Sequence, residues 1–576
     1  MNTIKKLFPY IKPYMIFVIL SPLFMMLEVT MDLAQPRFTQ KIIDIGIANR
    51  DTAYVLHTSA KMLGAALLGV IGGVGCTIFS TLAAICIGTE TRNKLFSHIQ
   101  TLSAADCDKL ERGSLITRLT NDIDQLQEAI IMLLRMLVRS PLLVIGSLFM
   151  AVVTSPKLAV MFILLLPFII FMLWLINKRG LPLFSLVQKR IDKINSVIEE
   201  NLSGIRVIKA FVRSRYEENR FAVSNDNLYR SNVAVIMLMI TIFPIMFLAI
   251  NTAIVCALWF GGNLVVVHKS MEVGGVLAFI TYLTQTAGSM TMMGMIISRL
   301  SRAGVSADRI IEVMDTQPSI TESAAPANPK EVRGEITFDN VTAAYSGAPI
   351  LENISFTVKP GEKLVVMGET GSGKSTLVNL IPRLYDTAAG NLLIDGVNVR
   401  DISFDFLRKH IAIVMQKTML FSGTVRENIR YGNPEADDND IDEALKAAQA
   451  YDFVTNLSEG ADTVLGQNGV NLSGGQRQRL TIARALAAKP AILIFDDCTS
   501  ALDMTTERKL LAALENMNCT KVIVAQRLTT AKDADRVLVL DKGGIAGLGT
   551  YEELAKSCEV FRRIAESQNK GETLNG

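Results

Sequence analysis

The residues best suited to chemistry lie in a glycine-rich segment in the second half of the chain. It consists of Gly368, Glu369, Thr370, Gly371, Ser372, Gly373, Lys374, Ser375 and Thr376. Glycines at this spacing let backbone N–H groups curl around phosphate oxygens, while Lys374 can reach the β- and γ-phosphates and the Ser375 hydroxyl can bind Mg²⁺. The apolar run 363–367 before the segment is typical of a strand, and 375–384 after it is typical of a helix. The segment therefore predicts a nucleotide-binding site.

Composition indicates that the chain is only partly soluble. Its 576 residues are 50% hydrophobic and 20% charged, with a mean hydropathy of +0.33. Because the apolar excess lies in the first half, we expect a membrane domain followed by a soluble domain. The net charge of +3 gives no indication of nucleic acid as a partner. The seven cysteines are scattered without metal-ligand spacing, and structural disulfides are not expected.

Six apolar stretches in the first half are long enough to cross a membrane. They centre on residues 15–35, 60–87, 129–153, 158–178, 233–260 and 272–297. The connections near 88–128 and 179–232 are long and basic, whereas the turns 154–157 and 261–271 each hold a single lysine. The positive-inside rule places both long connections and both termini in the cytoplasm. The basic, aromatic residues 1–14 are expected to form an interfacial helix before a retained first span.

Charged residues inside these spans are notable because charge is costly in a bilayer. Glu28 and Asp32 lie four residues apart on one face of the first span, and Arg135 and Arg139 lie four apart in the third. Pairing among such residues is the favoured interpretation, and contact with a transported substrate is the alternative. Methionines crowd the last two spans, where core packing is favoured over an adaptable binding surface.

A segment rich in Pro, Ala and Ser marks a domain boundary. It is expected to be a linker over 316–333, following a membrane domain over 1–315. Beyond it, short strands alternate with helices, which predicts an α/β P-loop NTPase domain over 334–576.

Two cytoplasmic segments and one further motif carry a resemblance to a known family. Segments 107–127 and 195–221 lie in the two basic loops, and NLSGGQRQRLTIARAL occupies 471–486. Together with the P-loop they resemble ATP-binding-cassette (ABC) exporters over essentially the whole chain. The resemblance implies the type I ABC exporter fold: six transmembrane helices with long cytoplasmic extensions, a coupling helix in each loop, and an α/β ABC ATPase domain.

The resemblance also implies roles for single residues. Tyr345 would stack on adenine, Asp496 would hold Mg²⁺ through water, and Gln416 would bind Mg²⁺ and help to place the attacking water. The LSGGQ signature would grip the γ-phosphate through Ser473, Gly474, Gly475 and Gln476. Residues 500–503 resemble the D-loop. In this family each ATP lies between one P-loop and the signature of a second nucleotide domain, so a chain with one of each needs a second half-transporter.

Three residues depart from the family pattern. Asp497 stands where hydrolytic members have a glutamate that polarises water, and Gln526 stands where they have a histidine. The aspartate is one methylene shorter, and an amide cannot carry a proton or a charge, so both changes indicate slow hydrolysis. Gln467 replaces a glutamate common in exporters, with an effect that the sequence leaves open. Asp497, Gln526 and Gln416 are the predicted catalytic residues.

A weakened Asp497–Gln526 pair beside an intact P-loop and signature favours one subunit of a heterodimeric ABC exporter of the multidrug or lipid type. This chain would supply the P-loop and Walker B aspartate of a slow, degenerate site and the LSGGQ of the hydrolytic site. ATP and Mg²⁺ are the expected cofactors, amphipathic small molecules the expected substrates, and a bacterial plasma (inner) membrane the expected location. The alternatives are a slow homodimeric exporter and a regulatory or channel-like membrane protein gated by ATP.

Overall fold

The computed structural model describes residues 8–345, 348–499 and 502–573. Within these ranges, the structure describes the backbone but not the side chains of Arg112, Leu181, 294–301, Tyr345 and 568–573. The chain divides into two compact units: 1–100 with 110–317, and 101–109 with 318–576.

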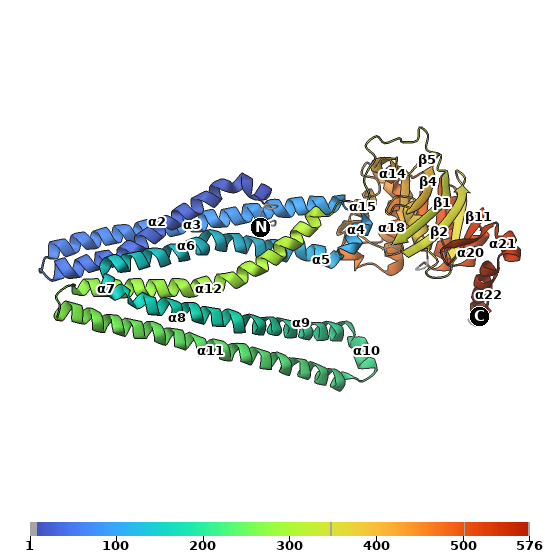
Figure 1. The fold of residues 1–576 in the computed structure, drawn as a ribbon. Helices are drawn as coiled ribbons and strands as arrows, with labels where there is room; N and C mark the ends of the chain where they lie inside the picture. The colour runs from blue at the N-terminus through green and yellow to red at the C-terminus, as the bar shows by residue number, and fades with distance from the viewer. Residues whose placement is uncertain (1–7, 346–347, 500–501, 574–576) are drawn as a thin grey trace. The chain divides into compact units, whose positions relative to one another are not determined.

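The first unit is built from long helices, as Figure 1 shows. They are α2 (Met15–Lys41), α3 (Thr52–Thr101), α6 (Ile123–Thr154), α8 (Met161–Leu175), α9 (Leu181–Ser203), α11 (Ser214–Val266) and α12 (Val273–Asp315). Shorter helical segments connect them: η1 (Lys12–Tyr14), η2 (Ile42–Ile47), α5 (Arg112–Thr117), η3 (Arg118–Asp122), α7 (Pro156–Ala159), η4 (Ile176–Gly180) and α10 (Ile205–Ala210).

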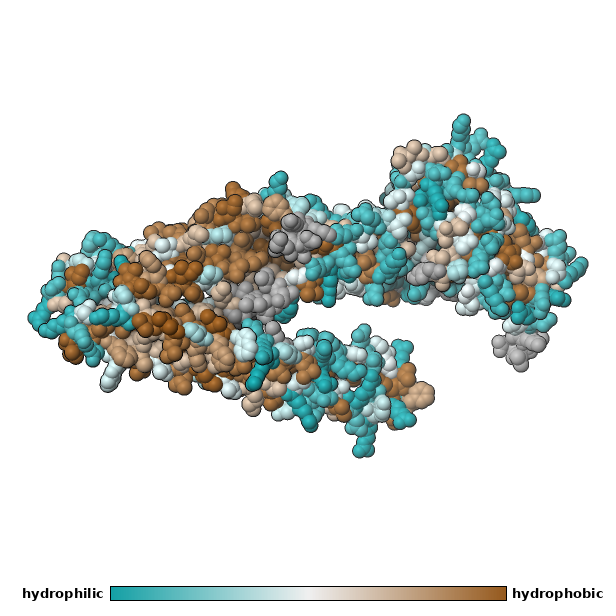
Figure 2. Space-filling model, in the orientation of Figure 1, coloured by the Kyte–Doolittle hydropathy of each residue, from teal (hydrophilic) through white to brown (hydrophobic). Residues whose placement is uncertain are grey.

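Several of these helices have the length and composition of membrane spans. In the described residues, five stretches qualify: Phe8–Ile47, Thr52–Thr101, Gly113–Thr154, Pro156–Ser203 and Ser214–Val266. They contain the first five predicted spans. The sixth, 272–297, lies in α12 and runs into 294–301, whose side chains lie outside the description. Figure 2 shows hydrophobic residues over the middle of these helices and hydrophilic residues gathered towards their ends, which is the pattern of a bilayer-spanning bundle.

One hydrophobic core of the first unit gathers residues of α6, α8, α11 and α12. The rings of Phe162 and Phe279 pack edge to face with their centroids 5.8 Å apart. Tyr282 in α12 is fully buried, and its hydroxyl donates to the backbone oxygen of Leu33 in α2 at 2.9 Å. In lipid such interhelical hydrogen bonds help to hold helices together, since no water competes for the polar groups.

An ion pair joins α2 to α6. The Arg139 guanidinium binds the carboxylate of Glu28 and lies 3.0 Å from Oδ2 of Asp32. The pairing interpretation is therefore confirmed for these three residues. Arg135, one turn earlier on α6, forms no ion pair or hydrogen bond within the described part of the chain.

The second unit contains two main sheets. One has the strand order β2-β1-β4-β5 and is antiparallel. The other has the order β12-β11-β3-β10-β9-β6, in which every pair is parallel except β12 with β11. A short pair joins β7 to β8. The strands are β1 (Ile336–Tyr345), β2 (Ala348–Val358), β3 (Lys363–Gly368), β4 (Ala389–Ile394), β5 (Val397–Asn398), β6 (Ile411–Val414), β7 (Gly423–Thr424), β8 (Val464–Leu465), β9 (Ile492–Asp496), β10 (Thr520–Val524), β11 (Arg536–Asp541) and β12 (Gly544–Gly549).

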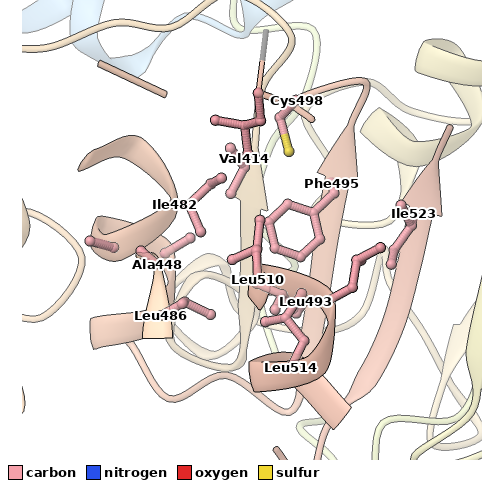
Figure 3. Close-up of a cluster of buried hydrophobic side chains, with 14 of the residues drawn as sticks. Val414, Ala448, Ile482, Leu486, Leu493, Phe495, Cys498, Leu510, Leu514 and Ile523 are labelled. Carbon is pink, nitrogen blue, oxygen red and sulfur yellow. The ribbon is translucent and has the colours of Figure 1, made fainter. Parts of the chain in front are cut away.

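Between and after its strands, the second unit contains a series of helices. They are α13 (Lys374–Leu380), α14 (Phe404–His410), α15 (Val425–Arg430), α16 (Asp438–Ala447), α17 (Tyr451–Thr455), α18 (Gly474–Ala487), α19 (Met504–Glu515), α20 (Leu528–Lys532), α21 (Tyr551–Ser557) and α22 (Glu559–Thr573), with 3₁₀ turns η5 (Gly460–Asp462) and η6 (Gln467–Gly469). Neighbouring residues of β9 point into two different hydrophobic cores. Ile494 belongs to the core that the larger sheet shares with the antiparallel sheet, and Phe495 belongs to the core between the larger sheet and the helices, which is drawn in Figure 3. A strand buried on both faces needs a continuous apolar run, which explains the sequence 491–495. A helical unit followed by this α/β unit confirms the predicted fold class.

A short helix from the loop between the second and third predicted spans packs within the second unit. It is α4 (Ala104–Lys109), in which Asp106 accepts a hydrogen bond from the backbone N–H of Ser319 at 2.9 Å. The hydroxyl of Tyr385 donates to Asp108 at 3.0 Å. Polar side chains thus fix this loop segment to the α/β domain, as expected of a coupling helix.

The Arg139 ion pair leads to a stability prediction. Arg139→Met keeps the side-chain volume and removes the charge, so it leaves two carboxylates without a counter-charge in an apolar layer. We expect the thermal-unfolding midpoint of the purified chain to fall by several degrees. Replacing all three partners together (Glu28→Gln, Asp32→Asn, Arg139→Met) should recover part of the loss.

Arg135→Met is the matched control, since it breaks no ion pair in the described residues, and it should not lower the midpoint. An equal fall for the single and the triple variant would contradict the ion-pair account.

Candidate nucleotide-binding site

The predicted phosphate loop connects β3 to α13. Gly368 ends the strand, and a Cβ at that position would lie 2.4 Å from the backbone oxygen of Leu540. Gly373 has φ +97°, a left-handed conformation that side chains rarely adopt, and a Cβ there would lie 2.6 Å from Leu351. Only glycine fits these two positions, so the backbone can close tightly around an anion.

Lys374 lies across this loop. Its ammonium group donates to the backbone oxygens of Gly368 at 2.8 Å and Glu369 at 2.7 Å. Burial lowers the pKa of Lys374, while the carboxylates of Asp497 and Asp496 act in the opposite direction. The cation is thus held at the mouth of the loop, where phosphate charge would favour its protonated form.

A hydroxyl and a carboxylate meet beside the loop. Ser375 donates to Oδ1 of Asp496 at 2.9 Å, and Asp496 ends β9 with 5% of its surface exposed. Burial raises the pKa of Asp496 despite this hydrogen bond. Mg²⁺ usually takes one or two protein oxygens together with phosphate and water, and a bound cation would favour the ionised carboxylate, so this donor pair fits the ion.

The three predicted catalytic residues converge on one carboxylate. Gln416 follows β6, Asp497 follows β9 and Gln526 follows β10, and these strands are neighbours in the order β10-β9-β6. Oδ2 of Asp497 accepts hydrogen bonds from the amide of Gln416 at 3.1 Å and from the amide of Gln526 at 2.6 Å. Asp497 is 7% exposed and has φ +49°. Parallel strands end at a shared edge, which is why residues far apart in sequence meet here.

The signature segment caps a helix. The Ser473 hydroxyl accepts from the backbone N–H of Gln476 at 3.3 Å, and the Gln476 side chain accepts from the backbone N–H of Ser473 at 2.8 Å. This capping box fixes the first turn of α18. Ser473 and Gly474 are exposed, while Gly475 and Gln476 are half-buried. Within the described residues, no hydrogen bond or ion pair joins the signature to the phosphate loop.

Two further residues predicted from the sequence are Tyr345 and Gln467. Tyr345 pairs with Ala348 at the end of β1, but its side chain lies outside the described part of the chain. Gln467 is exposed in the 3₁₀ turn η6.

The sequence did not predict the contacts that hold the residue next to Gln526. The next residue, Arg527, binds the carboxylate of Glu507 and donates to the backbone oxygen of Leu502 at 3.3 Å. Glu507 in α19 is 4% exposed. This pair ties the segment after β10 to the predicted D-loop. The only sequence signal is a glutamate on the apolar face of a helix.

A P-loop α/β domain joined to a bundle of apolar helices defines a membrane transporter driven by a nucleotide. The family model for the ABC transporter transmembrane region matches residues 18–290, and the ABC transporter model matches residues 351–500. The chain belongs to the ABC transporter family. It binds ATP and couples ATP hydrolysis to transport.

Known relatives cover nearly the whole chain. An uncharacterised ABC transporter ATP-binding protein of Bacillus subtilis, YfiB, is 39% identical over 98% of this chain and 98% of its own length. An ATP-dependent lipid A-core flippase of Syntrophus aciditrophicus is 33% identical over 86% of this chain and 83% of its own length. The solved structure of a bacterial Atm1-family ABC exporter with ATP bound aligns with a TM-score of 0.76 and 26% identity over 96% of this chain and 98% of that one. The fold is therefore that of the type I exporters.

The Ser375–Asp496 pair leads to a prediction about Mg²⁺. Ser375→Ala removes the hydroxyl ligand, so we expect ATP binding in the presence of Mg²⁺ to weaken by about tenfold or more. Binding in excess chelator should change little. Titration with a fluorescent ATP analogue under both conditions measures the difference.

Ser375→Thr keeps the hydroxyl on an exposed side chain and should bind nearly as well as the wild type. Equal losses for Ser375→Ala with and without Mg²⁺ would show that Ser375 acts on the nucleotide rather than on the ion.

Proposed function

We propose that this chain is one subunit of a heterodimeric ABC exporter and that its own P-loop forms the slow ATP site. The observation that carries the proposal is the environment of Asp497. Its short carboxylate is held by two amides, from Gln416 and Gln526. Hydrolysis of ATP to ADP and phosphate requires a water molecule to lose a proton, and neither amide can take it.

The signature of this chain supports the second half of the proposal. Ser473 and Gly474 are exposed at the start of a well-capped helix, so they are accessible to an ATP molecule bound by another chain. A partner with a glutamate and a histidine at the two altered positions would form the efficient site with this signature. ATP would be bound here by the loop 368–376 and by Tyr345, and Mg²⁺ by Ser375, Asp496 and Gln416.

The cytoplasmic loops support a second chain as partner. In the first loop, α4 packs within the same unit as the nucleotide domain of this chain. In the second, α10 ends in apolar side chains that are largely exposed, with Phe211 at 73% and Val212 at 85%. An exposed apolar cluster of this kind is typical of an interaction surface, and the nucleotide domain of the partner subunit would cover it.

The transport cycle follows from these parts. ATP binding would close the two nucleotide domains on each other, and the coupling helices would turn the membrane helices outward. Hydrolysis at the efficient site would then reset them. We place the nucleotide domain (334–576), the linker (316–333) and both termini in the cytoplasm, and the membrane domain (1–315) in the bacterial inner membrane. Amphipathic small molecules are the proposed cargo, and the relative named as a lipid A-core flippase favours lipid-like molecules among them.

Single-turnover ATP hydrolysis tests the heterodimer directly. We expect the purified chain alone to hydrolyse ATP slowly, and its complex with a half-transporter that has a glutamate and a histidine at the two altered positions to hydrolyse ATP quickly. In the complex, Ser473→Ala should lower the rate by about tenfold or more, because it weakens the efficient site. Asp497→Asn should change the rate little, because it alters only the slow site.

Comparable rates for the chain alone and the complex would instead indicate a homodimer in which Asp497 is a working catalytic carboxylate. A larger loss from Asp497→Asn than from Ser473→Ala would reverse the assignment of the two sites.

Two substitutions should raise the rate of ATP hydrolysis at the slow site. Asp497→Glu together with Gln526→His restores the longer carboxylate and a group that can carry a proton. We expect the single-turnover rate of the chain alone to rise by about tenfold to 100-fold, since displacement by about 1 Å can cost 10²-fold. Gln467→Glu is the matched control: it reverses the third departure at an exposed turn and should leave the rate unchanged. No gain from the double variant would mean that these residues do not limit hydrolysis.

A further inference from the structure

A cavity of about 510 Å³ lies within the first unit, between α2, α6 and α12. Residues from all three helices line it, among them Met25, Arg135, Arg139, Ser140, Gln285 and Ser289. Its volume falls in the range of small-molecule sites, and most of its lining is apolar with a few polar groups, as in such sites generally.

The two arginines of the cavity have different surroundings. Arg139 binds both Glu28 and Asp32, so its charge is already compensated. Arg135 has no ion pair or hydrogen bond within the residues that the structure describes. An unpaired cation at membrane depth is costly, and such residues commonly face a cavity that receives a ligand.

Neutral polar groups of the same cavity are also unsatisfied. The amide oxygen of Gln285 is buried and accepts no hydrogen bond. Ser140 and Ser289 are 5% and 8% exposed, and neither hydroxyl forms a hydrogen bond in the described part of the chain. A buried polar group without a partner costs free energy, which a ligand with complementary groups would recover.

The sign of the charge on the residues that line the cavity determines which class of ligand it can bind. Glu28 and Asp32 do not line the cavity, and both are engaged by Arg139. The charged residues that line it in the described structure are therefore both arginines. Guanidinium groups bind carboxylate, phosphate or sulfonate oxygens through charge-assisted hydrogen bonds. A cationic amphiphile would meet the unpaired Arg135 and be repelled.

The remainder of the lining suits an alkyl or aromatic group. Met25, Met132, Met136 and Met292 also line the cavity, and Met292 is 59% exposed. Methionine side chains are flexible and polarisable, so they adapt to apolar groups of different shape. The cavity thus combines groups that can bind an anion with adaptable apolar side chains.

We propose that this cavity binds the acidic head of an anionic amphiphile and that such amphiphiles are the transported substrates. Arg135 donates charge-assisted hydrogen bonds to the acid, Ser140 and Ser289 add neutral ones, and Gln285 accepts from a donor on the ligand. This inference rests on the proposed export function, because it names the class of cargo for that function.

A matched pair of fluorescent probes tests the inference on the full-length chain in lipid nanodiscs without ATP. The probes are 11-(dansylamino)undecanoic acid, which is anionic, and its methyl ester, which is neutral. We expect the acid to bind at least about tenfold more tightly than the ester, the scale of a hydrogen bond to a charged group. Empty nanodiscs correct for partition into lipid.

Three variants test whether the probes bind in this cavity. Arg135→Gln should abolish the preference for the acid, and Arg135→Lys should retain most of it. Gly288→Leu should weaken binding of both probes, because Gly288 lines the cavity and a Cβ there meets no atom within 4 Å, so the larger side chain occupies empty space.

Equal binding of acid and ester by the wild type, or a preference that survives Arg135→Gln, would overturn the inference. Because these measurements involve no hydrolysis, they are independent of the ATPase test of the heterodimer. Selective binding without coupled hydrolysis would contradict the proposed function while the ligand class stands.

Discussion

The nucleotide site depends on one constraint: three neighbouring parallel strands, β6, β9 and β10, end at the same edge of a sheet. The residues that follow them, Gln416, Asp497 and Gln526, therefore converge although they are far apart in sequence. The strands supply the geometry for phosphoryl transfer, and the residue types at their ends determine the rate. With one short carboxylate between two amides, the edge orients Asp497, and neither amide beside it can accept a proton.

The proposal of a second chain rests on groups that are exposed elsewhere in the structure. The Ser473 capping box fixes the first turn of α18 yet leaves Ser473 and Gly474 exposed. The two long loops of the membrane unit differ in the same way. Asp106 and Asp108 hold α4 within the unit of the nucleotide domain, whereas the apolar end of α10 around Phe211 is exposed. Exposed binding groups on rigid supports are expected of a subunit that completes its sites on a partner.

Much of this organisation could be predicted from sequence because it is encoded locally. The phosphate loop is specified by glycines such as Gly373, whose φ of +97° side chains rarely adopt. The apolar run of β9 and the basic loops between spans are also local signals. The convergence on Asp497 could be inferred only through a resemblance, and the support of Gln526 by Arg527 and Glu507 could not be inferred at all. These contacts depend on tertiary packing, which residue spacing does not specify.

The membrane unit shows this limit most clearly, because Arg135 and Arg139 have the same residue type and lie one helical turn apart. Sequence periodicity places both on one face of α6 and assigns them the same environment. Both line the cavity, but the structure gives them different partners: Arg139 meets the two carboxylates of α2, whereas Arg135 has no ion pair among the described residues. Both acids are bound to one arginine, so Arg135 presents its charge to the cavity, where an anionic group on the cargo would bind it.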